Sequence, residues 1–281
     1  TMIFANVLNL TLNFLLIFGL GHWSGLGAEG AALASSIVRY CIAGILIWVI
    51  WTLKDHQAFG VRDKVHSRWS DWREQRRIGY GAGASLGAEV AGFAILGLLA
   101  AQLGAVSMAG FGLLFQVQSV FFMLASGLGT ATAVRVGISN SAVDKSAAVR
   151  VAILGTLLIF AIMIMVAMFY WSIPEAILGI FTRSPELLAI TIPLMAVGGF
   201  AVIFDGAQFV LSNALRGFGD TWWPTIIQSL AFLIIMVPAA YWTAHSLDMG
   251  VGGLIWGIVA GCIISVMLLS VRLYFLGLKK D

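Results

Sequence analysis

The chain has 281 residues, of which 60% are hydrophobic and only 10% are charged, and its formal net charge is +3. Soluble domains have charged residues at about a quarter of their positions, so this composition excludes an ordinary soluble protein. Apolar stretches recur along the whole length between short polar turns. The sequence therefore predicts an all-α polytopic membrane protein.

Eight of these stretches are predicted to cross the bilayer as helices. Crossing about 30 Å of hydrocarbon at about 1.5 Å per residue requires about 20 apolar residues, and most of the stretches reach that length. The predicted spans are Ile3–Phe18, Glu29–Trp51, Ile78–Leu103, Ser107–Gly129, Val149–Trp171, Leu187–Leu215, Trp223–Trp242 and Gly250–Leu276.

The first two spans resemble the last two. Leu33 and Cys41 recur as Leu254 and Cys262 at a constant shift of 221 residues, together with three apolar positions between and beside them. Read as a duplication, this predicts a repeating unit of six helices, as in transporters built from two bundles. We expect residues 1–53 to be the last two helices of an N-lobe, residues 54–77 to be a cytoplasmic or interfacial linker, and residues 78–281 to be a complete six-helix C-lobe. The chain starts at Thr1 and enters an apolar helix almost at once, so it is expected to be a fragment without four N-terminal helices.

Basic residues set the expected orientation, because Lys and Arg in short loops stay on the cytoplasmic side. Of the 16 basic residues, Arg183 lies on one side, Arg39 lies inside span two, and all the others lie on the opposite side. Both chain ends are therefore expected in the cytoplasm. In the linker, Trp69 and Trp72 lie three residues apart among arginines, a pattern typical of a helix in the headgroup layer, either as a simple connector or as an anionic-lipid site.

Glycines mark expected helix contacts, because a residue without a side chain lets two backbones approach closely in lipid. Gly253, Gly257 and Gly261 follow one another at four-residue spacing on span eight, and Gly83 and Gly87 do so on span three. The expected role is packing.

Two acids lie inside apolar spans, where an unpaired carboxylate is costly and usually faces a partner, a cavity or a pathway. Asp205 lies 11 residues before Arg216, and Glu89 lies 12 residues after Arg77, both counted from the same membrane surface. Both carboxylates are therefore expected roughly 16 to 18 Å deep, near the midplane. The matching depth favours one shared cavity that exchanges a proton or binds a sodium ion. Two separate structural acids are the alternative.

Other polar and aromatic side chains are candidates for the same cavity. Asn9 and Asn13 lie with Asn6 on one stripe of span one, either for ion or substrate contact or for hydrogen bonds between helices. The substrate-cavity candidates, for which ordinary packing is the alternative, are Gln116, Gln118, Gln208, Phe121, Phe122 and Met123.

Enzyme signatures are absent from the sequence. It has no supportable Ser/His/Asp set, no phosphate-binding glycine loop and no paired acidic motif of the kind that metal-dependent transferases carry. Cys41 and Cys262 lie inside predicted helices without a disulfide framework or metal-ligand spacing. We expect no catalytic residue, no cofactor, no metal apart from sodium at Glu89 and Asp205, and no nucleic-acid partner. The histidines, all in loops or at helix ends, are His22, His56, His66 and His245.

Several short motifs follow one another along nearly the whole chain. They are Asn9-Leu10-Thr11-Leu12-Asn13 with Leu16-Ile17-Phe18-Gly19, then Gly30-Ala31-Ala32-Leu33-Ala34, Ser85 to Glu89, Leu128-Gly129 with Val134-Arg135-Val136-Gly137, and Asp205-Gly206-Ala207-Gln208 with Leu215-Arg216-Gly217 and Asp220-Thr221. In these motifs the chain resembles the multidrug and toxic compound extrusion (MATE) family, of the bacterial drug/sodium type.

The resemblance implies twelve spans in two six-helix lobes, of which this chain is similar to the fifth to twelfth. It implies export of amphipathic organic cations in exchange for sodium ions or protons, by alternating access between the lobes. Glu89 and Asp205 fall where the family places its C-lobe cation-binding carboxylates. Asn9 and Asn13 fall on the N-lobe helix that contributes to a cation site in some members.

Three positions depart from the family pattern. Ala201 stands where some members have a tyrosine, Phe122 replaces an aromatic residue that can be tyrosine, and Gly110-Phe111-Gly112 stands where many members have Ala-His-Gln. These departures leave the coupling ion and the range of drugs open.

The sequence-based hypothesis is a monomeric, cation-coupled multidrug antiporter of the bacterial inner membrane, with small organic cations and the lipid bilayer as its partners. A lipid-linked oligosaccharide flippase of the same superfamily is the first alternative, and it would favour a cationic cavity for phosphate. An intramembrane prenyl or glycosyl transferase is the second alternative, and it would need a paired Asp motif, which is absent from the sequence. A non-transporting fragment is the third alternative.

Overall fold

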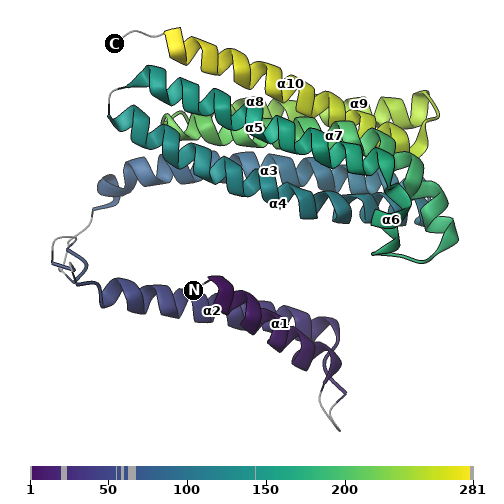
Figure 1. Cartoon of the computed structure of the whole chain (residues 1–281), viewed down its shortest axis with the longest axis horizontal. Coiled ribbons are helices and arrows are strands. Elements are labelled where there is room, and N and C mark those ends of the chain that lie inside the picture. Colours follow the sequence, from purple (N-terminus) through teal and green to yellow (C-terminus); the bar gives the residue numbers. More distant parts are fainter. Residues whose placement is uncertain are drawn as a thin grey trace. The chain divides into compact units, whose positions relative to one another are not determined.

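The computed structural model describes residues 2–19, 24–54, 56–57, 60–62, 68–142 and 144–278. All regular structure in these residues is helical, and seven helices are long and apolar enough to cross a membrane, with Ile3–Phe18 as a shorter apolar helix. The predicted all-α polytopic class is confirmed. The chain divides into two compact units, residues 1–71 and 72–281, and each is described by itself (Figure 1).

The first unit is a hairpin of two helices, α1 (Met2–Phe18) and α2 (Ala28–Trp51). The Leu26 backbone N–H donates to the Leu16 carbonyl (2.8 Å), which ties the turn to the end of α1. Gly27 precedes α2 with a φ of +56°, a backbone conformation that glycine adopts without a steric cost. Gly30 packs directly against the Leu16 backbone, where a side chain would collide.

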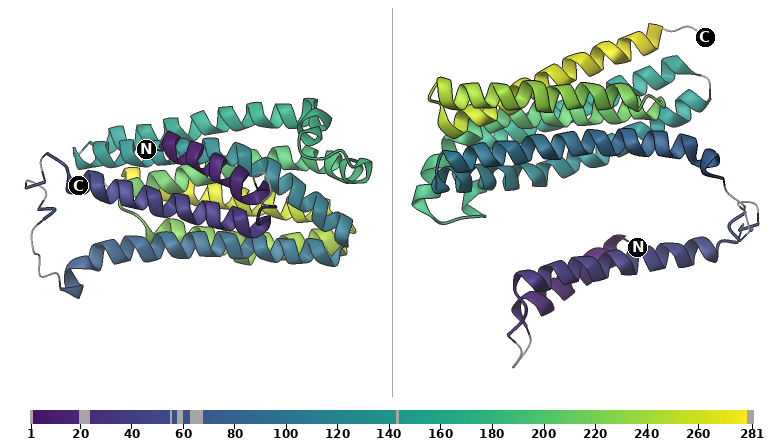
Figure 2. Two further views of the ribbon diagram at one scale, coloured as in Figure 1. Left: turned by 90° about the horizontal axis from the view of Figure 1, so that it is seen from below. Right: turned by 180° about the vertical axis from the view of Figure 1, so that it is seen from behind.

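The second unit is a helix bundle that follows a single 3₁₀ turn (Figures 1 and 2). Its penultimate span, residues 222–246, consists of four consecutive helical segments. The elements are η1 (Trp69–Trp72), α3 (Arg73–Gln102), α4 (Ala105–Ser141), α5 (Lys145–Ser172), α6 (Pro174–Gly179), α7 (Pro185–Gly217), α8 (Trp222–Ser229), η2 (Leu230–Met236), α9 (Val237–Tyr241), η3 (Trp242–Ser246) and α10 (Gly250–Leu278).

Helix α7 is the core of this bundle and packs against α4, α5 and α10. It begins with Ser184, whose hydroxyl accepts from the Leu187 N–H, and with Pro185 at the first helical position, where a missing N–H costs nothing. Its glycines allow close packing, since a Cβ at Gly206 would lie 2.8 Å from the Met163 side chain. Most of the helix is apolar, as expected of a buried helix, and its buried polar residues include Asp205, Gln208 and Ser212.

The penultimate span departs from regular α-helix. Segments η2 and η3 are π-helical, and Pro238 is the second residue of the short α-helical segment between them. Proline has no N–H to donate and its ring crowds the preceding turn, so wider turns on either side relieve the mismatch.

The predicted spans each correspond to a helix, but some boundaries are wrong. Helix α4 continues well past the predicted end at Gly129, so Arg135 lies within the helix instead of in a turn. The extension has a packing cause: Thr132 and Val136 are fully or almost fully buried, and Val136 belongs to a second core cluster with residues of α5 and α7. Helix α6 was not predicted.

Several predictions concern residues that the structure describes only in part. Residues 55, 58–59 and 63–67 of the expected linker lie outside the described residues, as do His22, Lys279, Lys280 and both chain ends. In the described part, Trp69–Trp72 is a single 3₁₀ turn with exposed tryptophans, and α3 already begins at Arg73. The assignment of the two units to an N-lobe and a C-lobe stays a prediction.

The glycine prediction is correct on α10 and wrong within this unit on α3. Gly253 packs on the backbone at Ala244, and Gly257 on that at Ala240. Added Cβ atoms at Gly83 and Gly87 meet nothing within 4 Å. On α3 it is Gly81 and Gly92 that contact neighbouring helices; the contacted residues are Thr221, Thr225, Phe232 and Met236.

Replacing Gly257 with Ala is expected to destabilise the bundle. The new Cβ would lie 2.5 Å from the Ala240 Cα, a backbone atom that cannot move aside, and overpacking of this kind costs about 1–3 kcal/mol. The measurement is the thermal unfolding midpoint of the purified protein in one detergent. Gly83→Ala is the matched control and should be neutral or slightly stabilising, because the new methyl meets no neighbour. Equal midpoints for the two variants would contradict this packing.

Candidate functional site

Asp205 lies on α7 with only 5% of its surface exposed. The Gln208 side chain, one turn later on the same helix, donates from Nε2 to Asp205 Oδ1 (3.2 Å). The buried Cys262 thiol of α10 approaches the same oxygen (3.9 Å), and the buried Gln118 of α4 lines the same cavity as Asp205. Asp205 is therefore contacted by neutral donors from α7 and α10, with no basic residue in direct contact.

Glu89 lies on α3 and is half-buried. Its carboxylate makes no hydrogen bond or ion pair with any residue that the structure describes. It is repelled by Asp205 and attracted by Arg216 through the interior of the bundle. Glu89 thus keeps its capacity to accept hydrogen bonds or to bind a cation.

The two acids line one cavity of about 460 Å³. The structure brings them together as their matching depths suggested, between α3, α4 and α7. The other lining residues are apolar except for Gln118 and Ser119, and they include four phenylalanines. They are Leu86, Val90, Phe93, Ala94, Phe111, Phe115 and Phe122.

Three of the phenylalanines form a connected aromatic wall. The ring centres of Phe93 and Phe115 lie 5.2 Å apart, and those of Phe111 and Phe115 lie 6.5 Å apart. Aromatic faces attract cations, and carboxylates in apolar surroundings do so more strongly than in water. The arrangement suits an amphipathic cation or a small metal cation.

The remaining predicted residues fall in different places. Phe122 lines the cavity, while Gln208 lies behind it, fully buried, as a partner of Asp205. Gln116 is exposed outside the cavity, and the glutamine that lines it is Gln118. The two glutamines are two residues apart, which turns their side chains to well-separated faces of a helix. Gln116 does not line this cavity, and its contact with a substrate stays a prediction.

Asn9 and Asn13 belong to the first unit. The Asn13 side chain donates from Nδ2 to Asn9 Oδ1 (2.9 Å), so the two amides pair along one face of α1. Both residues are half-buried in the hairpin. Their role in cation binding stays a prediction.

Sequence reasoning missed a buried chain of polar side chains that extends from Asp205 to the C-terminal end of α7. Gln208 Oε1 accepts from Gln228 Nε2 (2.8 Å), and Gln228 Oε1 accepts from the Ser212 hydroxyl (3.1 Å) and from Arg216 Nη2 (3.1 Å). One signal was available, because Gln208, Ser212 and Arg216 are spaced by four residues and share one face of the helix.

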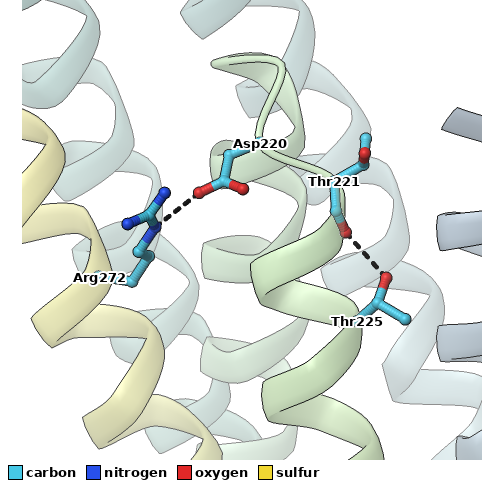
Figure 3. Close-up of polar contacts among 4 residues, drawn as sticks. All are labelled: Asp220, Thr221, Thr225 and Arg272. Carbon is cyan, nitrogen blue, oxygen red and sulfur yellow. Dashed lines mark hydrogen bonds and ion pairs between the residues drawn. The ribbon is translucent and has the colours of Figure 1, made fainter. Parts of the chain in front are cut away.

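The polar turn after α7 has a structural role. Asp220 accepts a hydrogen bond from Arg272 Nε of α10 (2.7 Å), and the Thr225 hydroxyl donates to the Thr221 carbonyl (2.8 Å), as Figure 3 shows. The same hydroxyl lies 2.7 Å from the Gly81 carbonyl of α3. The turn is thereby fixed to two neighbouring helices.

The described residues contain no group of three or more His, Cys, Asp or Glu side chains that would bind a metal ion. Any metal cation at Glu89 and Asp205 would therefore have two carboxylates and neutral oxygens as ligands. Sodium fits such a site better than zinc, which prefers nitrogen and sulfur ligands.

Residues 83–242, more than half of the chain, match the family model described as MatE. The chain belongs to the MatE family. Members of this family are transporters and not enzymes, as the sequence also predicted for this chain.

Two bacterial relatives support the same conclusion. The "Probable multidrug resistance protein NorM" of Caulobacter vibrioides is 32% identical over 268 residues, which are 95% of this chain and 57% of that protein. The "Multidrug resistance protein NorM" of Burkholderia vietnamiensis is 30% identical over 273 residues, 95% of this chain and 58% of that protein. The MatE chain thus spans less than two thirds of the length of these relatives.

The fold of this MatE chain is also that of solved transporters. The structure described as "eukaryotic MATE transporter AtDTX14" superposes with a TM-score of 0.84 at 21% identity, over 99% of this chain and 61% of that chain. The expected MATE-like fold is confirmed.

Replacing Gln208 with Leu is expected to destabilise the protein by about 1–3 kcal/mol, because it leaves buried groups on Asp205 and Gln228 without their partner. The measurement is again the thermal unfolding midpoint in detergent. Gln116→Leu is the matched control, since this exposed side chain has no described side-chain partner. A Gln208→Leu variant as stable as the control would contradict the assigned hydrogen bonds.

Proposed function

We propose that this protein is a cation-coupled antiporter that exports amphipathic organic cations, including drugs, by alternating access. The observation that carries the proposal is the pair of acids, Glu89 and Asp205, in one aromatic cavity of a MatE-family chain. The names of the bacterial relatives, which refer to multidrug resistance, support the same substrate class.

The coupling step follows from the electrostatics of the cavity. Glu89 and Asp205 repel each other when both are charged, so an incoming sodium ion or proton is stabilised between or on them. An organic cation is stabilised by the same negative charge. The two cations therefore compete, and binding of the coupling ion displaces the substrate.

The shape and chemistry of the cavity favour an amphipathic substrate. A volume of about 460 Å³ accommodates a drug-sized molecule, and the apolar lining includes Phe93, Phe115 and Phe122. The charge of the substrate would face the carboxylates, and its aromatic or aliphatic part would contact the phenylalanines.

The same cavity argues against the flippase alternative. A lipid-linked oligosaccharide carries phosphate, which requires basic groups or backbone donors at the site. None of the residues that line this cavity is basic, and two are acidic.

The proposal also covers the membrane in which the protein lies and a second site of cation contact. Seven apolar helices make the protein a multi-pass membrane protein. A bacterial inner membrane with both ends of this chain on the cytoplasmic side is proposed, and the distribution of basic residues supports this orientation. Asn9 and Asn13 are proposed as a further cation contact in the first unit, and the transporter is proposed to act as a monomer without a cofactor.

Asp205→Asn and Glu89→Gln are each expected to lower efflux at least about tenfold, because each removes one of the negative charges that attract both cations. The measurement is efflux of a fluorescent organic cation from cells that express the full-length transporter, normalised to the amount in the membrane.

Glu186→Gln is the matched control, since this exposed acid lies in the first turn of the same helix as Asp205. It should leave efflux unchanged. Normal efflux by a well-expressed Asp205→Asn variant would refute the proposed role of Asp205.

A further inference from the structure

Arg216 at the end of α7 is a cation held inside the bundle, close to the acid pair. Its Nη2 donates to the Ser85 hydroxyl of α3 (2.9 Å) and to Gln228 Oε1 of α8 (3.1 Å). Its Nε is buried and has no hydrogen-bond partner among the described residues. The guanidinium is therefore tethered by neutral oxygens, and its charge is not neutralised by a contacting acid.

Arg216 and the acids are linked by an oriented chain of amides. Gln228 Oε1 faces Arg216, so Gln228 Nε2 faces Gln208, and Gln208 Nε2 in turn faces Asp205. Both amide dipoles point in the same direction between a positive and a negative end. Gln208 and Gln228 are 0% and 2% exposed, so water does not screen this chain.

Glu89 lies one helical turn along α3 from Ser85, the residue to which Arg216 donates a hydrogen bond. Ser85 and Glu89 are four residues apart on α3 and share one face, which places them about 6 Å apart along the helix axis. Arg216 attracts the Glu89 carboxylate without forming an ion pair with it.

We propose that Arg216 is a resident counter-cation of the acid pair, which competes electrostatically with the coupling ion and lowers the affinity of the site for it. This inference rests on the proposed function. A transporter has to release its coupling ion as well as bind it, and a fixed positive charge outside the cavity weakens binding without blocking the cavity. Arg216 is thus a positioning and affinity-setting residue that acts through Glu89 and Asp205.

A purely structural role predicts something different. Arg216 joins α3, α7 and α8 through its hydrogen bonds, and loss of these bonds would disorder the acids and weaken cation binding. Loss of a competing positive charge would instead strengthen cation binding. The direction of the change therefore separates the two roles.

The test is equilibrium binding of ²²Na⁺ to the purified full-length transporter in detergent, for folded, monodisperse variants. Arg216→Gln is expected to bind sodium about tenfold more tightly, because it removes the repulsion between a fixed positive charge and the bound cation in a medium of effective dielectric about 20. Arg216→Lys keeps the charge and should stay within about threefold of the wild type. Arg216→Met is a second neutral variant, for the case that the Gln variant does not fold.

Arg272→Gln is the matched control. It removes an arginine that is partly buried but paired with Asp220, away from the cavity, and should leave sodium affinity unchanged. If the wild type takes up protons instead of sodium, the same variants are compared by the infrared band of the carboxyl groups over a pH series, where the neutral variants should show about tenfold higher proton affinity.

The outcomes separate the two proposals. A wild type that binds neither cation at Glu89 and Asp205 contradicts the proposed function. A wild type that binds, with neutral Arg216 variants that bind equally or more weakly, overturns the inference about Arg216 alone. A Lys variant that gains affinity as the neutral variants do also overturns it, because the charge would then not be the cause.

Discussion

The organisation of the second unit depends on the cost of placing the Asp205 carboxylate inside a membrane helix. Removing a carboxylate from water costs several kcal/mol even after relaxation, and this structure offsets the cost with neutral donors instead of a contacting base. Gln208 and Cys262 supply these contacts. Glu89, across the same cavity, has no such donors, so one acid is structurally satisfied while the other stays available. This asymmetry is what a site needs in order to bind and release a cation.

The packing of the helices makes the asymmetry possible. Helix α7 is buried among α4, α5 and α10, and glycines such as Gly206 allow neighbouring side chains to approach its backbone closely. The same burial removes water from the face of α7 that carries Gln208, Ser212 and Arg216. Helices α3 and α8 then complete the polar chain with Ser85 and Gln228. In an apolar bundle, this chain is a polar contact that joins all three helices, beside the contact of Thr225 with the Gly81 carbonyl.

Much of this could be predicted from the sequence, for a physical reason. The rise of an α-helix is nearly constant, so counting from a charged end gave the depths of Glu89 and Asp205 and their shared level. The direction of a side chain around the helix depends on packing, which is why the sequence offered both Gln116 and Gln118 for the cavity while only Gln118 lines it. Gln228 was missed because its partner Ser85 is far away in the sequence, at a separation of 143 positions. The end of α4 was misplaced because buried contacts, and not membrane thickness, determine where it stops.

The central claim is that Glu89 and Asp205 together take up the coupling cation. Difference infrared spectroscopy of the purified transporter tests it most directly, with sodium added at fixed pH and, separately, with the pH lowered in the absence of sodium. The account predicts a change in the carboxyl bands under at least one condition, and its loss in the double variant Glu89→Gln, Asp205→Asn. A spectrum that does not respond to either cation, or a response that persists in the double variant, would contradict the account.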